Sequence, residues 1–346
     1  MEKSPTLADV ARAAGVSRST AARAMSGSGY VDKVKRQLIE ETAIQLGYRG
    51  SAIARTLRTQ RSHTVGILIA DITNPIFPRI VRGADEVLTK EGITLLLCNT
   101  EGQPARQAAF VREMMERLAD GLILVSQSVD RELVETLRHG PPTVFVNRTP
   151  EPGAFDYVGP DNRQGIDLLL DHLTGLGHRR IAYITGPPDS STARDRHSRF
   201  LERMERLGLT VPDHAVVTGG YAAEHGRSAA DALLSVAPED RPTAVIASND
   251  FVALGLIERA QELGFSVPRD MSVTGYDNTF WDAIWHRAFP DAPRMTTIEQ
   301  PRRDIGHAAA RLLLDRLGTP DRTPRERLSP VSMIVGNTTT PPHVVR

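Results

Sequence analysis

Short apolar runs alternate with helix-length amphipathic segments over most of this 346-residue chain, and this alternation constrains its fold more than any other feature. The first runs span residues 65–70, 93–98, 121–125 and 143–147, and helices are expected near 76–91, 103–119 and 130–139. Strands that are apolar along their whole length and separated by helices form parallel sheets with both faces covered. The sequence therefore predicts a doubly wound α/β subdomain that begins near residue 63.

The same alternation repeats further along the chain. Apolar runs lie at 181–184, 244–247 and 271–276, with helices expected near 162–176, 193–207, 222–236 and 250–264. Two doubly wound parallel-sheet subdomains in tandem place a cleft between them, and ligands of such sheets bind outside the carboxyl ends of the strands. Polar residues that directly follow a strand are therefore candidates for ligand contact.

A different pattern occupies the N-terminal residues. Thr6 stands at an N-cap position, and Asp9 follows three residues later, as in a capping box. Apolar residues then recur at helical spacing between 7 and 14, and Gly15 can adopt the positive φ of a tight turn. Ser17 is a second N-cap, so a second short helix is expected from residue 18. Two short helices joined by such a turn predict a helix-turn-helix, whose second helix can enter the DNA major groove.

Charge supports a nucleic-acid partner for this part of the chain. Residues 1–62 hold eleven Lys and Arg against five Asp and Glu, a net charge of +6, whereas the whole chain is neutral. A basic head on an acidic body is typical of a DNA-binding module attached to a domain that need not touch DNA. Arg18 and Ser19 are expected at base edges, and Arg23 at a base edge or a phosphate.

These motifs, with Leu46-Gly47-Tyr48 ending a third helix, resemble the LacI family of bacterial transcriptional repressors, whose start reads T-x-x-D-V-A-x-x-A-G-V-S-x-x-T-V-S-R. The resemblance spans residues 5 to 342. It implies DNA-binding roles for Thr6, Ser17, Arg18, Ser19, Thr20, Arg23, Tyr48, Ala54, Leu57 and Arg58. In the family a hinge helix forms on the operator and its leucine, here Leu57, wedges into the minor groove. The chain departs from the pattern at Gly50, usually proline, and at Ala21-Ala22, usually Val-Ser.

The resemblance also implies a periplasmic-binding-protein-like effector domain. The expected organisation is a small all-α DNA-binding domain at 1–48, a hinge at 49–62, one effector subdomain at 63–162 and 298–325, and the other at 163–297 and 326–342. No heptad pattern follows the last expected strand at 330–335, so no coiled-coil tail is expected.

Effector contacts are expected from polar and aromatic residues at the strand ends. The candidate residues are Asp71, Asn74, Phe77, Asn147, Asp161, Thr192, Arg196, Tyr221, Asn249 and Asp277. Carboxylates, amides and guanidiniums recognise sugar hydroxyls, and an aromatic face covers the apolar side of the ring. Alternatives stay open, because Asp161 and Asp250 could simply cap helices and Phe77 could belong to the core. The family usually has aspartate at Asn147 and glycine at Arg199.

Residues 278–295 form a segment about six residues longer than is usual in the family, and it holds both tryptophans of the chain. Trp281 or Trp285 could stack on a ligand as a lid. The alternative is that they pack the segment onto the surface or onto a dimer partner.

The predicted function is a sequence-specific DNA-binding repressor controlled by a small-molecule effector, most simply a sugar acting as inducer. One short helix reads too few bases for specificity, so a homodimer on a pseudo-palindromic operator is expected. The alternatives are gating by a protein partner or a non-sugar ligand, and, remotely, a sugar-acting enzyme using Asp71 and Asp277. No phosphate-binding loop, nucleophile elbow or metal-spaced Cys/His cluster appears, so neither enzyme activity nor a cofactor or metal is predicted.

The single cysteine, Cys98, lies in an apolar run and is predicted to be a buried, inert thiol. One cysteine excludes an internal disulfide and fits a reducing cytoplasm. No apolar stretch reaches the roughly 18 residues of a membrane span, and the N-terminus lacks the apolar core of a signal peptide. The chain is therefore expected to be cytoplasmic, with no membrane partner.

Overall fold

The computed structural model describes residues 5–26, 29–48, 61–279 and 294–343. The chain divides into two compact units, residues 1–62 and residues 63–346, and each is described by itself. No helix in the described residues is long and apolar enough to cross a membrane.

The first unit is the predicted helix-turn-helix with a third helix. It consists of α1 (Leu7–Ala13), α2 (Arg18–Ser26) and α3 (Lys33–Gln45). The backbone N–H of Thr6 donates to Asp9 Oδ2 at 2.9 Å, which completes the capping box. Gly15 has the predicted positive φ, +65°. The core is small: Val10, Ala21 and Ile39 are fully buried, one from each helix.

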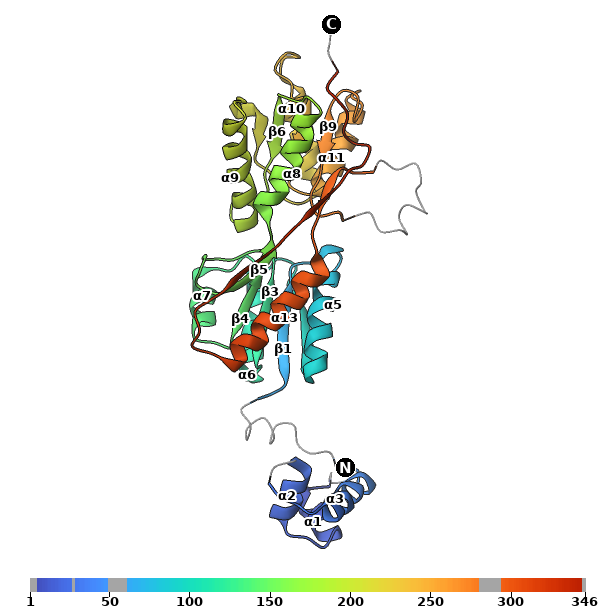
Figure 1. The fold of residues 1–346 in the computed structure, drawn as a ribbon, viewed down its shortest axis with the longest axis vertical. Coiled ribbons are helices and arrows are strands. Elements are labelled where there is room, and N and C mark those ends of the chain that lie inside the picture. Colours follow the sequence, from blue (N-terminus) through green and yellow to red (C-terminus); the bar gives the residue numbers. More distant parts are fainter. Residues whose placement is uncertain (1–4, 27–28, 49–60, 280–293, 344–346) are drawn as a thin grey trace. The chain divides into compact units, whose positions relative to one another are not determined.

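The second unit begins with a parallel sheet whose strand order is β11-β5-β4-β3-β1-β2 (Figure 1). The strands are β1 (Thr64–Ile69), β2 (Thr94–Asn99), β3 (Gly121–Val125), β4 (Thr143–Val146), β5 (Asp156–Pro160) and β11 (Glu326–Ser329). The helices are α5 (Ile76–Leu88), α6 (Pro104–Glu116), α7 (Arg131–Arg138) and α13 (Arg302–Gly318), with the 3-10 turn η1 (Thr89–Glu91) after α5. This is the first subdomain.

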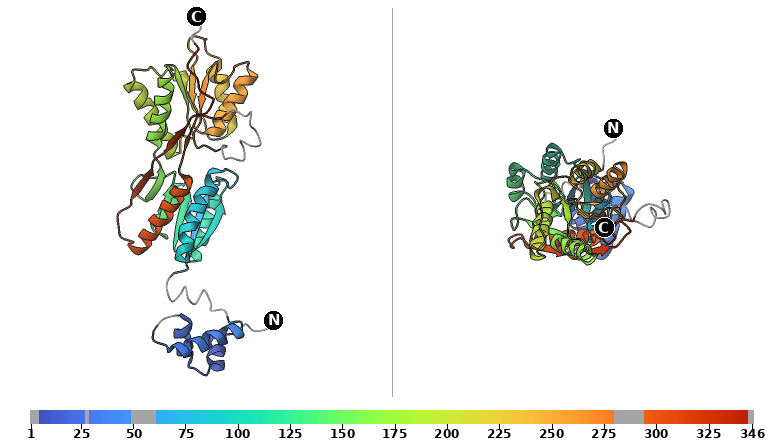
Figure 2. Two further views of the ribbon diagram at one scale, coloured as in Figure 1. Left: turned by 45° about the vertical axis from the view of Figure 1, so that its right-hand side comes forward. Right: turned by 90° about the horizontal axis from the view of Figure 1, so that it is seen from above.

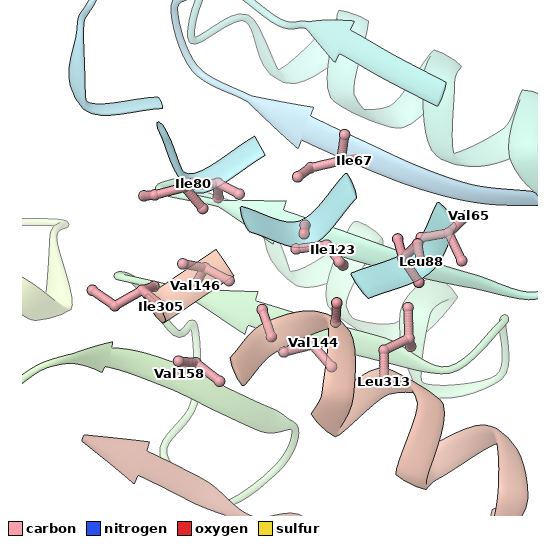
Figure 3. Packing of buried hydrophobic residues seen from close by; sticks show 14 of the residues in the cluster. Val65, Ile67, Ile80, Leu88, Ile123, Val144, Val146, Val158, Ile305 and Leu313 are labelled. Carbon is pink, nitrogen blue, oxygen red and sulfur yellow. The ribbon is translucent and has the colours of Figure 1, made fainter. Parts of the chain in front are cut away.

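Both faces of that sheet are buried, as continuous apolar strands require. On one face α5 and α13 pack over Ile67, Ile123 and Val144 (Figure 3). On the other face α6 and α7 pack over residues that alternate with these, such as Leu68 and Phe145. The predicted doubly wound layering is confirmed.

Helices α5 and α13 lie side by side because glycines allow their backbones to approach (Figure 2). A Cβ placed on Gly83 would lie 2.1 Å from the carbonyl oxygen of Arg303, and one on Gly306 would lie 2.1 Å from that of Ile80. Any larger residue at either position would force the helices apart.

The second subdomain has a parallel sheet of order β7-β6-β8-β9. Its strands are β6 (Ile181–Ile184), β7 (Val216–Val217), β8 (Ala244–Ile246) and β9 (Ser272–Thr274); its helices are α8 (Asn162–Gly175), α9 (Ser191–Arg206), α10 (Ala223–Leu234) and α11 (Asp250–Glu262), with the 3-10 turn η2 (Asp213–Ala215). Helices α8 and α9 cover one face and α10 and α11 the other. Two crossover strands, β10 (Thr297–Glu299) and β12 (Ser332–Ile334), pair antiparallel.

The assignment of residues 326–342 to the second subdomain is wrong for β11. This strand pairs in parallel with β5, with Glu326 opposite Tyr157, and forms the edge of the first sheet. Its sequence, Glu-Arg-Leu-Ser, is largely exposed and has no apolar run, so hydrophobicity could not identify it. The buried Asp156 positions it, since its carboxylate accepts from the backbone N–H of Arg325 at 2.8 Å.

Cys98 is half-buried rather than fully buried, and it packs against the cluster formed with α6 and α7. Burial raises the pKa of its thiol, which keeps the group protonated at neutral pH. A half-buried, protonated thiol fits the prediction that Cys98 is unreactive.

Candidate functional site

The start of α2 gathers exposed hydrogen-bonding groups on the first unit. Ser17 Oγ accepts from the backbone N–H of Thr20 at 3.1 Å and lies 2.8 Å from the hydroxyls of Ser19 and Thr20. Arg18 and Ser19 are exposed, whereas Ala21 on the other side of α2 is fully buried. The N-terminal turn of α2 therefore presents Arg18 and Ser19 outward, as recognition of base edges requires.

The positions of Arg23 and Tyr48 do not by themselves indicate a DNA contact. Arg23 Nε donates to the carbonyl oxygen of Ser19 at 3.4 Å, and Tyr48 packs half-buried against the core of the unit. The hinge residues Ala54, Leu57 and Arg58 lie outside the described residues, as do Trp281 and Trp285.

A cavity of about 190 Å³ lies at the strand ends of the second unit, between residues of the two subdomains. Nine predicted effector contacts line it: Asp71, Asn74, Phe77, Asn147, Thr192, Arg196, Tyr221, Asn249 and Asp277. We call this cavity the effector cleft. It is also lined by six residues that sequence reasoning did not assign to the site: Ala70, Ile76, Ser126, Arg148, Pro160 and Gln300.

Arg196 is the charged centre of the effector cleft and is only 4% exposed. Its Nε donates to Asn162 Oδ1 at 2.8 Å and its Nη1 to the carbonyl oxygen of Ser248 at 3.0 Å. The guanidinium stacks on the Tyr276 ring, 3.4 Å from the centroid, and Nη2 lies 3.9 Å from Asp277 Oδ1. Asp277 is buried, and although Arg196 opposes the shift, burial raises the pKa of its carboxyl.

Two acceptor oxygens in the effector cleft have no partner among the described residues. These buried atoms are Asn147 Oδ1 and Gln300 Oε1. Asn147 follows β4 with φ +64°, a conformation that asparagine tolerates, and its carbonyl oxygen accepts from Tyr157 Oη at 3.0 Å and from the Thr192 hydroxyl. Gln300 Nε2 donates to Asp277 Oδ1, which fixes the amide. Buried acceptors without donors need a hydroxyl or N–H from a ligand or water.

Arg148 joins the two subdomains at the rim of the effector cleft. Its guanidinium lies 5.3 Å from the centroid of the Tyr221 ring, and Nη1 donates to Ser128 Oγ at 3.0 Å. Ser128 Oγ in turn donates to Asp189 Oδ2 at 2.7 Å. Arg148 could have been predicted as a site residue because it directly follows a strand, beside Asn147. Gln300 lies in a crossover, and its sequence context does not indicate a ligand contact.

Asp161 does not line the effector cleft. It is the N-cap of α8, where its carboxylate accepts from the backbone N–H of Gln164 at 2.9 Å, so the capping alternative describes its place. Asp250 is not a cap, because Asn249 caps α11 by accepting from Val252 N at 2.9 Å. Phe77 satisfies both alternatives, since it is 6% exposed in the core and also lines the cleft.

Asp250 is fully buried and follows Asn249, which lines the effector cleft. Its Oδ1 accepts from Thr297 Oγ1 and its Oδ2 from Thr279 N, each at 2.6 Å. Burial, reinforced by the charge of Asp277, raises the pKa of Asp250 to about 7 even though these hydrogen bonds and Arg302 oppose the shift. The carboxyl is therefore largely protonated in the folded protein below neutral pH.

We expect this shift to make the protein less stable as the pH rises from about 4 to about 8. The folded state keeps a proton that the unfolded chain releases near pH 4, at about 1.4 kcal/mol for each unit of raised pKa. Chemical denaturation across this range, compared with Asp250→Asn, isolates the contribution. The variant loses an acceptor for Thr279 N and is less stable throughout, but its pH slope should be shallower. Equal slopes would contradict the prediction.

Comparison with known proteins follows the same division of the chain. The profile of the bacterial regulatory proteins of the lacI family matches residues 6–51, and a periplasmic binding protein-like domain matches residues 170–339. The ribose operon repressor of Escherichia coli K12 is 34% identical over 335 residues, covering 96% of this chain and 99% of that protein. The transcriptional repressor PurR of Photobacterium profundum is 32% identical over 314 residues, 90% of this chain and 92% of that protein.

Comparison with solved structures points to the same family. The lac repressor dimer bound to operator and the anti-inducer ONPF superposes with a TM-score of 0.81 at 25% identity, covering 98% of this chain and all of that one. A LacI family transcriptional regulator from Enterococcus faecium with bound ribose has a TM-score of 0.67 at 30% identity, covering 80% of this chain and 99% of that one. With this identity spread over nearly the whole length, the chain belongs to the LacI family of bacterial regulatory proteins.

Proposed function

We propose that this protein is a transcriptional repressor that binds operator DNA as a homodimer and is controlled by a neutral monosaccharide in the effector cleft. The first unit supplies base recognition through Arg18 and Ser19, with Leu57 of the hinge segment 49–62 as a minor-groove wedge. A dimer supplies two such helices for a pseudo-palindromic site. The solved lac repressor relative is a dimer on its operator, which supports this assembly.

The observation that carries the ligand class is the pair of buried acceptors, Asn147 Oδ1 and Gln300 Oε1, beside the carboxylates of Asp71 and Asp277. A cleft rich in acceptors calls for a ligand with several hydroxyl donors. The two carboxylates are balanced by Arg148 and Arg196, so the ligand itself needs no charge. At about 190 Å³ the cavity is smaller than the 300–1,000 Å³ typical of larger ligands, which favours a single sugar ring over a disaccharide.

Binding, not catalysis, fits these carboxylates. Asp277 is held by Gln300 and lies beside Arg196, while Asp71 Oδ1 accepts from Thr73 N at 2.9 Å and from Thr73 Oγ1 at 2.7 Å. A general acid needs a proton free to leave toward the substrate, and neither group is set up for this. We infer that the sugar acts as an inducer by favouring a conformation with weaker operator binding. A protein partner in the controlling role is the alternative that a silent sugar screen would favour.

The ligand test is a thermal-shift screen of monosaccharides, disaccharides and purines, followed by calorimetry on each hit. A ligand that binds only the folded state raises the unfolding midpoint. Asp71→Asn keeps the bond to Thr73 but replaces an acceptor with a donor, so we expect at least tenfold weaker sugar binding. Asp130→Asn, at the N-cap of α7 away from the cleft, is the matched control. Disaccharide or purine hits without monosaccharide hits would refute the proposed ligand class.

The proposed DNA recognition is tested with Arg18→Ala in a selected-site binding assay. We expect operator affinity to fall by about 1–3 kcal/mol and discrimination to relax at one base pair in each half-site. Arg12→Ala, an exposed arginine of α1 that pairs with Asp9, should leave base discrimination unchanged. A uniform loss across all sequences in Arg18→Ala would assign this residue to phosphate contact instead.

A further inference from the structure

A second cavity, of about 720 Å³, lies in the second unit beside the crossover that contains Glu299 and Gln300. We call it the crossover pocket. Its charged lining consists of Arg79, Arg82, Arg302 and Arg303 with the carboxylates of Glu299 and Asp304, a net charge of +2. The effector cleft, in contrast, has a balanced lining. The crossover pocket therefore attracts anions, whereas the effector cleft does not select for charge.

Arg302 carries the most unusual charge in this pocket. Its side chain is 3% exposed, and Nη2 donates to the carbonyl oxygens of Asp277 and Asn278, both at 2.7 Å. Its Nε has no hydrogen-bond partner among the described residues, and none of their carboxylates forms an ion pair with it. Burial lowers the pKa of Arg302 and the charge of Arg79 adds to this effect, although the negative charges of Asp277, Glu299 and Asp250 oppose it. The nearby carboxylates compensate this buried guanidinium only in part, since none of those described forms a direct ion pair with it, so a counter-ion in contact with Arg302 would stabilise it.

The other cations of the crossover pocket differ in how far they are neutralised. Arg82 and Arg303 both bond to Glu86, at 3.1 Å and 2.8 Å, and together with His307 they hold the pKa of that carboxyl at about 2. Arg79 is exposed and forms no ion pair with any described residue. Arg79 and Arg302 are therefore the two positive charges available to a ligand.

The first turn of α13 adds backbone donors at the same place. The residue at its N-cap is Pro301, which has no side-chain acceptor, so no described side chain caps the amides of Arg303 and Asp304. Helix α13 spans Arg302–Gly318, long enough to develop the partial positive charge at its N-terminus that favours bound phosphate.

From these groups we propose that the crossover pocket binds a small phosphate-bearing anion, held by Arg79 and the first-turn amides of α13 and neutralising the charge of Arg302. The anion is small because two residues of the lining, Glu299 and Asp304, are acidic and would repel a larger polyanion. Its binding requires neither sugar nor DNA.

The crossover pocket shares structure with the effector cleft. Gln300 lines both cavities and bonds to the carboxylate of Asp277, while Arg302 holds the carbonyl oxygen of the same residue. An anion that shifts Arg302 therefore acts on Asp277, and the two sites become coupled. This regulatory part rests on the proposed function, and by linkage each ligand must change the affinity of the other by the same factor.

The direct test titrates inorganic phosphate into the full-length protein by calorimetry, with sodium chloride holding the ionic strength constant. We expect saturable binding in the wild type and at least tenfold weaker binding in Arg79→Ala, which removes a charge-assisted contact from an exposed position. Arg106→Ala removes an arginine of α6 that pairs with Glu101 at 2.8 Å and should bind like the wild type. No saturable binding, or equal binding in Arg79→Ala, would overturn the site.

The coupling test measures the affinity for the identified monosaccharide with and without phosphate. A several-fold change in the wild type that is absent in Arg79→Ala supports the regulatory link. Phosphate binding with unchanged sugar affinity would overturn the link and leave the anion site standing. A protein that binds phosphate but no sugar refutes the proposed function and not the crossover pocket.

Discussion

Replacing Arg196 with methionine is expected to lower the free energy of unfolding by about 3–5 kcal/mol at neutral pH and to abolish sugar binding. The substitution keeps most of the volume over the Tyr276 ring but removes the cation beside buried Asp277. It also leaves Asn162 Oδ1 and the carbonyl oxygen of Ser248 without their donors. The buried carboxylate of Asp277 keeps only Gln300 and the more distant charge of Arg302 to stabilise it, and this loss together with two lost hydrogen bonds sets the size of the effect.

The pH dependence of the stability of Arg196→Met tests whether the buried carboxylate of Asp277 causes the loss. Without Arg196, the pKa of Asp277 should rise further above that of the unfolded chain, so the variant folds with a proton that the unfolded chain releases. Its stability should therefore fall as the pH rises, and the deficit against the wild type should shrink toward pH 5. Urea denaturation at several pH values measures this. Arg259→Met, which breaks half-exposed ion pairs with Asp231 and Glu262, should cost under about 1 kcal/mol. Equal losses in the two variants would contradict the prediction.

Replacing Asp156 with asparagine should lower the free energy of unfolding by about 3–5 kcal/mol and release the edge strand β11. The carboxylate is fully buried and accepts from Arg316 Nε at 2.9 Å and from both terminal nitrogens of Arg322 at 2.8 Å. Asparagine leaves two guanidiniums without a negative partner in the interior. Because the same carboxylate holds Arg325 N, the pairing of β11 with β5 weakens as well.

Two measurements separate these consequences. In Asp156→Asn, hydrogen exchange at the backbone amides of β11 should be faster than it is in the wild type. The increase should be larger in β11 than in the central strand β3, because the edge strand opens first. Although burial raises the pKa of Asp156, the arginine hydrogen bonds outweigh it and the pKa is lowered. Its stabilisation is therefore present above the ordinary aspartate value and is lost as the pH falls through the lowered pKa, so the gap between wild type and variant narrows in acid. Asp315→Asn, half-exposed and 3.8 Å from Arg325, is the control and should change little. An unchanged exchange rate in β11 would refute the role of Asp156.

Sequence periodicity determined much of this protein. The strands β1, β3 and β8 lie within a residue or two of the apolar runs that predicted them, because a parallel strand covered on both faces must be apolar along its length. The helix-turn-helix was equally determined, since the Thr6 and Asp9 capping box and Gly15 act within a few residues of one another. Strand-end polarity identified Asp71 and Asp277, the family resemblance identified Arg196, and all three line one cavity.

Tertiary structure decided what depends on residues distant in sequence. The strand β11 is placed by its backbone pairing with β5 and by Asp156, about 170 residues earlier, whose carboxylate accepts from the backbone N–H of Arg325. Gln300 reaches the effector cleft because the crossover places it against Asp277, and Arg148 spans the rim because Tyr221 and Ser128 converge there. Asp161 directly follows a strand, as a ligand-binding residue would, yet its carboxylate caps the N-terminus of α8. Local patterns record backbone preference and burial, whereas the partner of a buried polar group is set by how the whole chain packs around it.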